Sequence, residues 1–304
     1  YLSASIGYAL YPDDTTDFDK LISYADIAMF KSKTEKSNKC FRFNKEMYDN
    51  INNKVGVIND LKRAIEKDEF DVYFQEIVDV KSQEVAYIEA LIRWHSNKGV
   101  IMPKDFIPIA EETGFIQTLD LIVINKALRY FKNIKLDKRY QNTKLTINVS
   151  PALLLNKNFP DNLNDLTHKL HIANDEVCIE INENTFVNNK EESRKQIKLL
   201  KDLGFLIALD DFGREYSSLS ILNKVDFDII KIDRLFIINL DLRLNVEIIN
   251  MINKIAQLSD NIVIVEGVET EEQKEKLMNL GCYLMQGFLF SKPAKILVKE
   301  KVEV

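Results

Sequence analysis

The chain has 304 residues, of which 46% are hydrophobic and 29% are charged. This composition is typical of a globular protein with a large core and excludes intrinsic disorder. Lys and Arg number 41 against 47 Asp and Glu, a formal net charge of −6 that argues against coating of DNA or RNA polymers. Because no apolar run approaches the roughly 18 residues that span a bilayer, we expect no membrane contact by this chain.

The cysteines and histidines limit the redox compartment and the type of metal site. Cys40, Cys178 and Cys282 are odd in number and far apart, and no CxxC occurs. We therefore expect a reducing, cytoplasmic location, which leaves open a membrane tether through upstream domains of a parent protein. His168 and His171 stand in a polar stretch that predicts a solvated helix end. A catalytic metal should then have oxygen ligands, which favours Mg²⁺ or Mn²⁺ over zinc.

The first fifty residues form a separate segment. The sequence predicts a strand over Leu2–Leu10, a helix over Phe18–Lys33 and a short strand over Cys40–Phe43. The polar stretch 44–54 lacks apolar periodicity and indicates a boundary between residues 1–50 and 51–304. A fragment this small cannot fold alone, so we expect it either to be the end of a larger domain or to pack against the part of the chain that follows. The beginning of the chain has neither Met nor a charged region and is expected to be a strand cut from a longer chain, not a signal peptide.

After residue 54, predicted strands alternate with predicted helices. The strands are expected over Val72–Val80, Val85–Trp94, Leu145–Val149, Val177–Ile181, Phe205–Leu209, Ile229–Ile232, Ile262–Val265 and Cys282–Phe290. The helices are expected over Pro103–Glu112, Thr118–Phe131, Pro160–Leu170, Lys190–Leu203, Tyr216–Leu222, Asn245–Leu258 and Glu271–Leu280. Eight strands with intervening helices predict an α/β fold of the (β/α)₈ TIM-like barrel type. The alternative is an open doubly wound sheet, for which no glycine-rich nucleotide loop gives support.

Polar residues gather at the ends of the predicted strands. They are Glu89, Asn148, Glu180, Asp210, Asp211, Lys231, Asp233, Glu266 and Gln286. A carboxylate in an apolar strand is costly to bury unless it is paired or ligates a metal. The carboxyl ends of barrel strands meet at one rim, where active sites are built. Any single member could be a helix cap or a solvated acid, but the set predicts an oxygen-ligand metal site.

Eight ordered motifs at these positions resemble the EAL family of cyclic di-GMP phosphodiesterases. They are YFQEIVD at 73–79, IEALIRW at 88–94, INVSP at 147–151, EINE at 180–183, DDFG at 210–213, KIDR at 231–234, EGVET at 266–270 and QGFLFSKP at 286–293. Two earlier stretches, SASIGYALYP at 3–12 and YADIAMFKSK at 24–33, resemble the C-terminal part of a GGDEF domain. The GGDEF motif itself does not occur in this chain, so we expect no synthesis of cyclic di-GMP.

The resemblance implies a metal site and a reaction. Two Mg²⁺ or Mn²⁺ ions per site are implied, with Ca²⁺ inhibitory, and the reaction is the opening of cyclic di-GMP to linear pGpG. The implied metal ligands are Glu89, Asn148, Glu180, Asp210 and Asp211. Lys231 resembles the residue that orients the attacking water, and Glu266, Glu89 and Gln286 belong to the same catalytic centre.

The resemblance also implies how substrate and partner bind. Arg93 is similar to the residue that clamps a substrate phosphate, and Gln75 and Leu91 match substrate contacts. Glu183 matches the acid that steadies the loop after DDFG. A homodimer formed through the barrel is also implied.

Two positions depart from the family pattern. The loop reads DDFGREYSSL, with Arg214 and Glu215 where the family has Thr and Gly. Glu76 follows Gln75, where the family has Pro, and would weaken binding of an anionic ligand if its carboxylate pointed inward. Two hypotheses therefore stay open: a working phosphodiesterase, favoured by the complete ligand set, and a weak or inactive domain that acts as a cyclic di-GMP receptor.

Overall fold

The computed structural model describes residues 4–34, 40–97, 99–183, 185–188, 190–213, 222 and 225–296. The chain divides into two compact units, one of Tyr1–Lys67 with Pro108–Ala110 and one of Asp68–Ile107 with Glu111–Val304. Arg214 and Glu215 lie outside the described residues, as does most of the expected helix Tyr216–Leu222.

The first unit contains β1 (Ile6–Tyr8), α1 (Phe18–Thr34), β2 (Cys40–Arg42) and α2 (Lys45–Glu66), with β1 and β2 paired in parallel. The rings of Tyr24 and Phe43 stack with centroids 3.9 Å apart. Helix α2 runs through the stretch 44–54 that the sequence indicated as a boundary. Its start is fixed locally, because the Asn44 side chain accepts a hydrogen bond from the Met47 amide at 3.0 Å. A helix start of this kind needs no apolar periodicity, so the sequence pattern did not reveal it.

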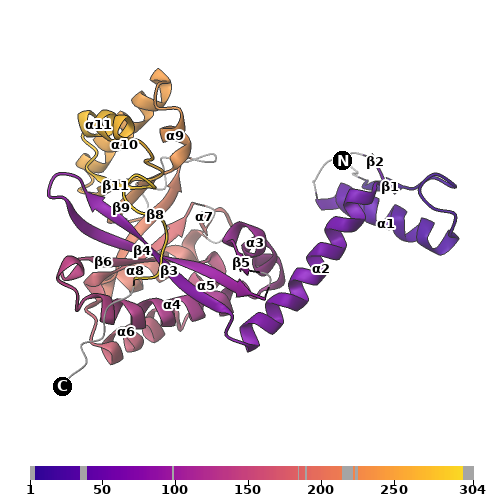
Figure 1. Cartoon of the computed structure of the whole chain (residues 1–304), viewed down its shortest axis with the longest axis horizontal. Helices are drawn as coiled ribbons and strands as arrows, with labels where there is room; N and C mark the ends of the chain where they lie inside the picture. Colours follow the sequence, from indigo (N-terminus) through magenta and orange to yellow (C-terminus); the bar gives the residue numbers. More distant parts are fainter. Residues whose placement is uncertain are drawn as a thin grey trace. The chain divides into compact units, whose positions relative to one another are not determined.

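The second unit contains a closed eight-stranded barrel, which confirms the predicted (β/α)₈ class (Figure 1). The strands are β3 (Phe70–Asp79), β4 (Glu84–Ser96), β6 (Lys144–Asn148), β7 (Val177–Asn182), β8 (Leu206–Phe212), β9 (Ile229–Ile232), β10 (Ile262–Val265) and β11 (Leu284–Gln286). Around the barrel the order is β3-β11-β10-β9-β8-β7-β6-β4, and the pairing of β3 with β4 closes it. Among the described residues, the short β5 (Gly99–Ile101) pairs with the carboxyl end of β4.

Strand β3 runs antiparallel to both of its neighbours, whereas the other barrel neighbours pair in parallel. The cause is the connection to β4, where only residues 80–83 separate the two strands. A parallel connection needs a crossover of a dozen or more residues. A turn this short therefore forces an antiparallel hairpin. As a result, Gln75 lies opposite Glu89 in the middle of β3 rather than at its end.

Helices surround the barrel. They are α3 (Pro103–Thr113), α4 (Ile116–Ile134), α5 (Pro151–Leu154), α6 (Phe159–Leu170), α7 (Thr185–Asn188), α8 (Lys190–Asp202), α9 (Arg234–Ile238), α10 (Arg243–Leu258) and α11 (Glu271–Asn279), with 3₁₀ turns at Lys138–Tyr140 and Asn174–Glu176. Helices α4, α6 and α8 lie side by side outside the sheet (Figure 1). The buried stripe of α4 includes Leu119, Val123, Ala127 and Phe131, the spacing of one helix face.

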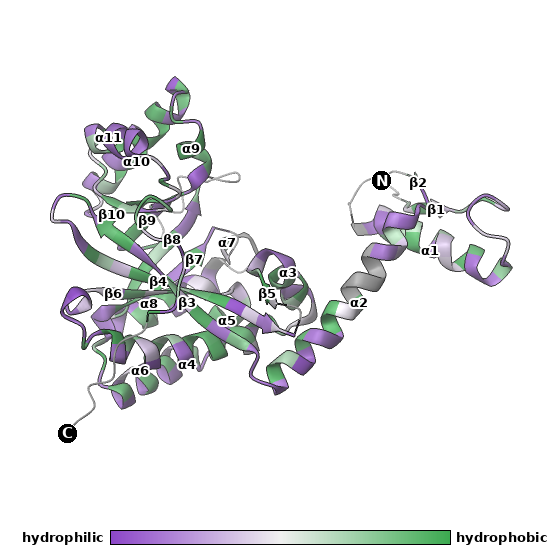
Figure 2. Cartoon of the chain, in the orientation of Figure 1, coloured by the Kyte–Doolittle hydropathy of each residue, from purple (hydrophilic) through white to green (hydrophobic). Residues whose placement is uncertain are grey.

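Hydropathy follows this layered arrangement, with apolar strands inside and mixed helices outside (Figure 2). The three cysteines are free, and His168 and His171 are exposed at the end of α6, as predicted. The expected strand Cys282–Phe290 is shorter than predicted, spanning Leu284–Gln286, and the backbone of the following Gly287 approaches that of Val268 too closely for any Cβ. Among the described residues, no helix has both the length and the apolar character to cross a bilayer.

Candidate active site

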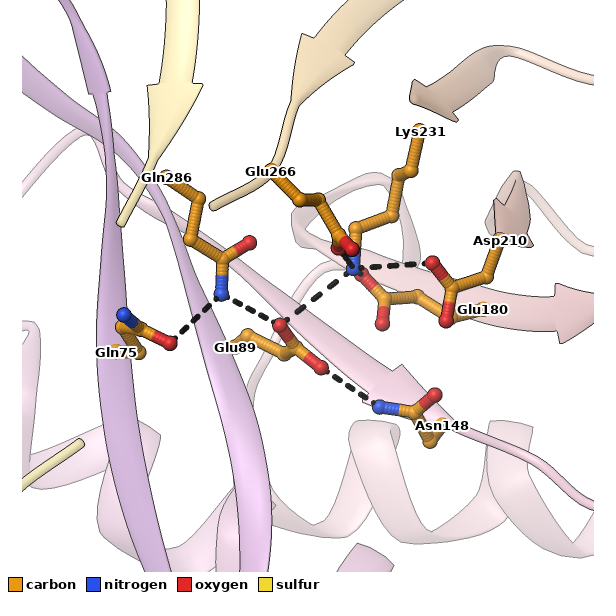
Figure 3. Close-up of polar contacts among 8 residues, drawn as sticks. All are labelled: Gln75, Glu89, Asn148, Glu180, Asp210, Lys231, Glu266 and Gln286. Atoms are coloured by element: carbon orange, nitrogen blue, oxygen red, sulfur yellow. Dashed lines mark hydrogen bonds and ion pairs between the residues drawn. The ribbon is translucent and has the colours of Figure 1, made fainter. Parts of the chain in front are cut away.

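Most of the predicted polar residues come together at the rim where the parallel strands end (Figure 3), whereas the Asp233 side chain accepts a hydrogen bond from the Leu235 amide at the start of α9. Side chains from separate strands contribute: Gln75 from β3, Glu89 from β4, Asn148 from β6, Glu180 from β7, Asp210 from β8, Lys231 from β9, Glu266 after β10 and Gln286 from β11. The register explains part of the clustering, since Asn148 lies opposite Glu180, and Gln75 lies opposite Glu89.

The Lys231 ammonium lies at the centre of four carboxylates. Its Nζ is 2.6 Å from Glu266 Oε1 and 2.8 Å from Glu180 Oε1, and 3.5 Å from both Glu89 Oε2 and Asp210 Oδ1. Lys231 is fully buried. One buried positive charge therefore faces four potential negative charges, which leaves the cluster short of positive charge.

Glu89 is held by amide donors as well as by Lys231. The Asn148 amide donates to Glu89 Oε1 at 2.8 Å, and the Gln286 amide donates to Glu89 Oε2 at 2.6 Å. Gln286 Nε2 also donates to Gln75 Oε1 at 3.2 Å. These bonds fix the orientation of the Glu89 carboxylate (Figure 3).

The shortage of positive charge appears in the pKa values. Burial, together with the nearby Glu89, raises the pKa of Glu180 well above its ordinary value, although Lys231 opposes the shift. Burial also raises the pKa of Glu266 to about 8. For Glu89, burial acts in the same direction, but Lys231, Gln286 and Asn148 together hold its pKa below the ordinary value. Burial alone would lower the pKa of Lys231, but the surrounding carboxylates raise it well above the ordinary value.

The site offers oxygen ligands suited to hard divalent cations. Carboxylate oxygens of Asp210, Asp211 and Glu266 all lie within 4.8 Å of one another. Glu180 Oε2 is buried and receives no hydrogen bond from the residues that the structure describes. Carboxylate and amide oxygens are the usual ligands of Mg²⁺ and Mn²⁺, so the residues present fit such ions.

A cavity of about 250 Å³ adjoins this cluster. Glu180, Asp210 and Asp211 line its polar end, and Leu91, Pro103, Ile116, Leu119 and Val123 are among its apolar walls. Asp120 also lines it, and burial raises the pKa of Asp120 to about 6. A charged cluster that continues into an apolar cavity could bind a ligand that combines an anion with a flat apolar ring.

The other predicted residues lie beside this centre. Leu91 lines the cavity, and Arg93 is buried, with its guanidinium carbon 5.5 Å from the centre of the Tyr73 ring. Glu183 directly follows β7, and the DDFG loop that it was expected to steady continues outside the described residues. Glu76 points neither into the site nor freely into solvent, because it is buried against Tyr140 and Arg139.

Asp120 was missed by the sequence reasoning. It stands on α4 within the run LDLIVI. The apolar spacing there predicts an ordinary helix and assigns no separate role to an acidic residue. The available signal was its apolar surroundings in the sequence, since such a carboxylate is seldom buried without a purpose.

Comparison with known proteins agrees with this geometry. The EAL domain family matches residues 58–293. The cyclic di-GMP phosphodiesterase NbdA of Pseudomonas aeruginosa is 30% identical over 305 aligned positions, covering 99% of this chain and 38% of NbdA. The solved PaMucR phosphodiesterase in complex with c-di-GMP aligns with a TM-score of 0.73 at 29% identity, covering 79% of this chain and 97% of PaMucR.

A second solved structure contains manganese. The Klebsiella pneumoniae BlrP1 manganese and cyclic di-GMP complex aligns with a TM-score of 0.66 at 30% identity, covering 74% of this chain and 56% of BlrP1. The chain spans less than half the length of the curated relatives that it matches over nearly its whole length.

Proposed function

The chain belongs to the EAL domain family, and from this premise we propose that it hydrolyses cyclic di-GMP to linear pGpG. The observation that carries the proposal is the convergence of Glu89, Glu180, Asp210 and Glu266 on Lys231 at the barrel rim, beside a cavity with apolar walls. Relatives named as cyclic di-GMP phosphodiesterases and solved complexes with that ligand support the choice of substrate.

Two divalent ions, Mg²⁺ or Mn²⁺, would be held by this chain's oxygens. Glu89, Asn148, Glu180 and Asp210 would bind one ion, and Asp210 with Asp211 would bind the other, with Glu266 close by. Such ions supply a hydroxide nucleophile at neutral pH and neutralise charge on the phosphoryl oxygens.

The protein residues then have separate roles in the displacement. Lys231, with Glu266 beside it, orients the attacking water and offsets the negative charge that develops in the transition state. The water loses a proton as its oxygen bonds to phosphorus, the bond from phosphorus to the 3′-oxygen breaks, and the leaving 3′-oxygen takes up a proton, so that one water is added in total. Gln286 keeps the Glu89 carboxylate oriented through its 2.6 Å hydrogen bond.

Substrate contacts extend away from the cluster. Arg93 would clamp a phosphate with its planar donor fork, and Gln75 and Leu91 would contact the substrate beside it. The apolar part of the cavity would take a guanine ring, and the Asp120 carboxylate would accept hydrogen bonds from the ring N1–H and the exocyclic amino group.

An apolar surface supports the proposed homodimer. On α9 and the start of α10, Leu235, Ile238, Leu242 and Leu244 are between 49% and 69% exposed. A second copy of the barrel covering this face would bury them.

We further propose that residues 1–50 are the end of a GGDEF-like domain and that residues 51–304 form the EAL domain, in a cytoplasmic part of the parent protein. The three free cysteines support the location, and the parallel pair β1 and β2 beside α1 is consistent with a fragment of a larger sheet.

Incubating the chain with cyclic di-GMP and Mn²⁺, and separating the products by chromatography, tests the proposed activity. Formation of pGpG that stops on addition of EDTA supports it. Tight binding of cyclic di-GMP without any pGpG would instead support the receptor alternative.

A further inference from the structure

Glu76 is buried on the outside of the barrel, although the neighbouring residue Gln75 points inward to the site. Successive residues of a strand point to opposite faces, so the two side chains are separated by the sheet. Glu76 is only 8% exposed. Its Oε1 accepts a 2.7 Å hydrogen bond from the Tyr140 hydroxyl, and its Oε2 lies 2.8 Å from the Arg139 guanidinium. The carboxylate thus ties β3 to the 3₁₀ turn that precedes β6.

Ser291 joins the two sides of this strand. The Glu76 backbone amide donates to Ser291 Oγ, and the Gln75 side-chain amide donates to the Ser291 carbonyl, each at 3.0 Å. Two backbone hydrogen bonds between Phe74 and Ala294 hold the same segment against β3. Any rotation of β3 at Glu76 would therefore move both partners of the Gln75 hydrogen bond, the Gln75 side chain and Ser291.

From Gln75 the contacts continue to the centre of the site. Gln75 Oε1 accepts from Gln286 Nε2, which also donates to Glu89 Oε2 (Figure 3). A continuous series of contacts thus runs from Arg139 on the surface to Glu89 among the carboxylates.

We propose that Glu76, neutralised by Arg139, is a positioning residue that holds β3 so that the Gln75 amide faces the substrate. This inference rests on the proposed function for its substrate. It predicts that the charge balance outside the barrel controls binding inside it. A buried carboxylate that loses the one cationic partner found among the described residues is strongly unfavourable, and β3 would shift to expose Glu76 to water.

The variants separate charge from hydrogen bonding. Arg139→Met leaves Glu76 charged and unpaired by any cation among its described contacts. Glu76→Gln keeps an acceptor for Tyr140 but removes the charge that needs Arg139. The double variant removes both charges together. Lys135→Met is the matched control, because Lys135 forms a part-buried ion pair with Glu176 at 2.7 Å that involves neither β3 nor a proposed site residue.

Two readouts are measured on the whole chain. Calorimetry in Ca²⁺ gives the Kd for cyclic di-GMP, and spectra of protein labelled with ¹⁵N-glutamine give the Gln75 side-chain amide signals, assigned with Gln75→Asn. We expect Arg139→Met to raise Kd about tenfold and to shift the Gln75 signals, since misplacing one polar contact costs on the order of 1.4 kcal/mol. The double variant should return Kd to within about threefold of the unmodified chain.

The control defines the contrary result. Lys135→Met should lower Tm while leaving Kd and the Gln75 signals unchanged. Unchanged Kd and unshifted signals in Arg139→Met would overturn the inference, as would a double variant no better than Arg139→Met. If the unmodified chain neither binds nor hydrolyses cyclic di-GMP, the proposed function fails, whereas the Gln75 signals still decide whether Glu76 positions that side chain.

Discussion

Oε1 of Glu266 lies 2.6 Å from Nζ of Lys231, on a lysine that has no exposed surface. The same ammonium touches Glu180 at 2.8 Å, so one cation serves a buried and a part-buried carboxylate at close range. A lysine in this position does more than contact a substrate. It also holds together a cluster of like charges that would otherwise repel one another.

Replacing this lysine tests both roles. Lys231→Met keeps most of the volume but removes the charge, so the variant should lose about 3 to 5 kcal/mol of stability in EDTA, as expected for unpaired buried carboxylates. The Tm in EDTA and in Mn²⁺, followed by circular dichroism, measures this effect, and Mn²⁺ should raise Tm more in the variant than in the unmodified chain. Equal Tm values for the two proteins in EDTA would contradict the stabilising role.

The same variant should affect turnover more than binding. Because the proposed role of Lys231 lies in the transition state, kcat should fall about 10²- to 10³-fold while KM changes little. Lys201→Met is the control. Lys201 lies on α8 and pairs with Asp228 at 3.0 Å, away from the rim residues. A raised KM at constant kcat would make Lys231 a ground-state phosphate contact instead.

Removing single carboxylates tests the metal site. Glu89→Ala and Asp210→Ala should each abolish pGpG formation, because each removes a proposed ligand and leaves the remaining oxygens without the required arrangement. Titration with Mn²⁺ followed by electron paramagnetic resonance should show fewer bound ions per chain. Binding of cyclic di-GMP in Ca²⁺ should decrease less than turnover. Full activity in both variants would exclude this metal centre.

The sequence predicted the barrel and most of the rim residues because both depend on local patterns. Short apolar strands with Asn148, Glu180 or Asp210 at or near their carboxyl ends carry their own signal, and the barrel brings those ends to one rim. Gln75 was found only through its motif, because β3 is antiparallel and its position in the site follows from pairing with β4.

The contacts of Glu76 could not be predicted. Its partners Arg139 and Tyr140 are more than sixty residues away, and no local pattern states that the turn before β6 will lie against β3. The sequence raised an inward-pointing carboxylate, and the structure shows a different arrangement, buried and paired on the outer side of the barrel. The periodicity of apolar residues along the sequence does not predict tertiary pairs of this kind.

The altered loop gives a prediction that rests on sequence alone. Arg214→Thr with Glu215→Gly restores the family pattern, removes one charge of each sign close in sequence to Asp210 and Asp211, and permits positive φ at position 215. We expect a gain in kcat of about tenfold, since a strained φ costs on the order of 1 to 2 kcal/mol. Steady-state rates at saturating Mn²⁺ measure it. A slower or less dimeric double variant would show that Arg214 and Glu215 are adapted to each other or to a partner subunit.

Asp120 gives a prediction of pH dependence. Burial raises its pKa to about 6 in the folded chain, above the value of about 3.9 expected in the unfolded chain. The folded state therefore binds the proton more tightly, and the contribution of Asp120 to stability falls as pH rises from about 4 to about 6 and is constant above that. Asp120→Asn has no such titration.

The difference in unfolding free energy between Asp120→Asn and the unmodified chain should therefore move in favour of the variant by up to about 2 to 3 kcal/mol between pH 4 and pH 7. Urea unfolding at a series of pH values measures it, and the titrations of groups that do not interact with Asp120 cancel in the difference. Ligand binding should respond in the opposite sense. Only the ionised carboxylate accepts hydrogen bonds from both the ring N1–H and the exocyclic amino group, so the affinity of the unmodified chain for cyclic di-GMP in Ca²⁺ should decrease below pH 6. The affinity of Asp120→Asn should be lower at pH 7 and change less with pH. Parallel pH profiles for the two proteins would show that Asp120 does not contact the base, and the cavity would then need another occupant.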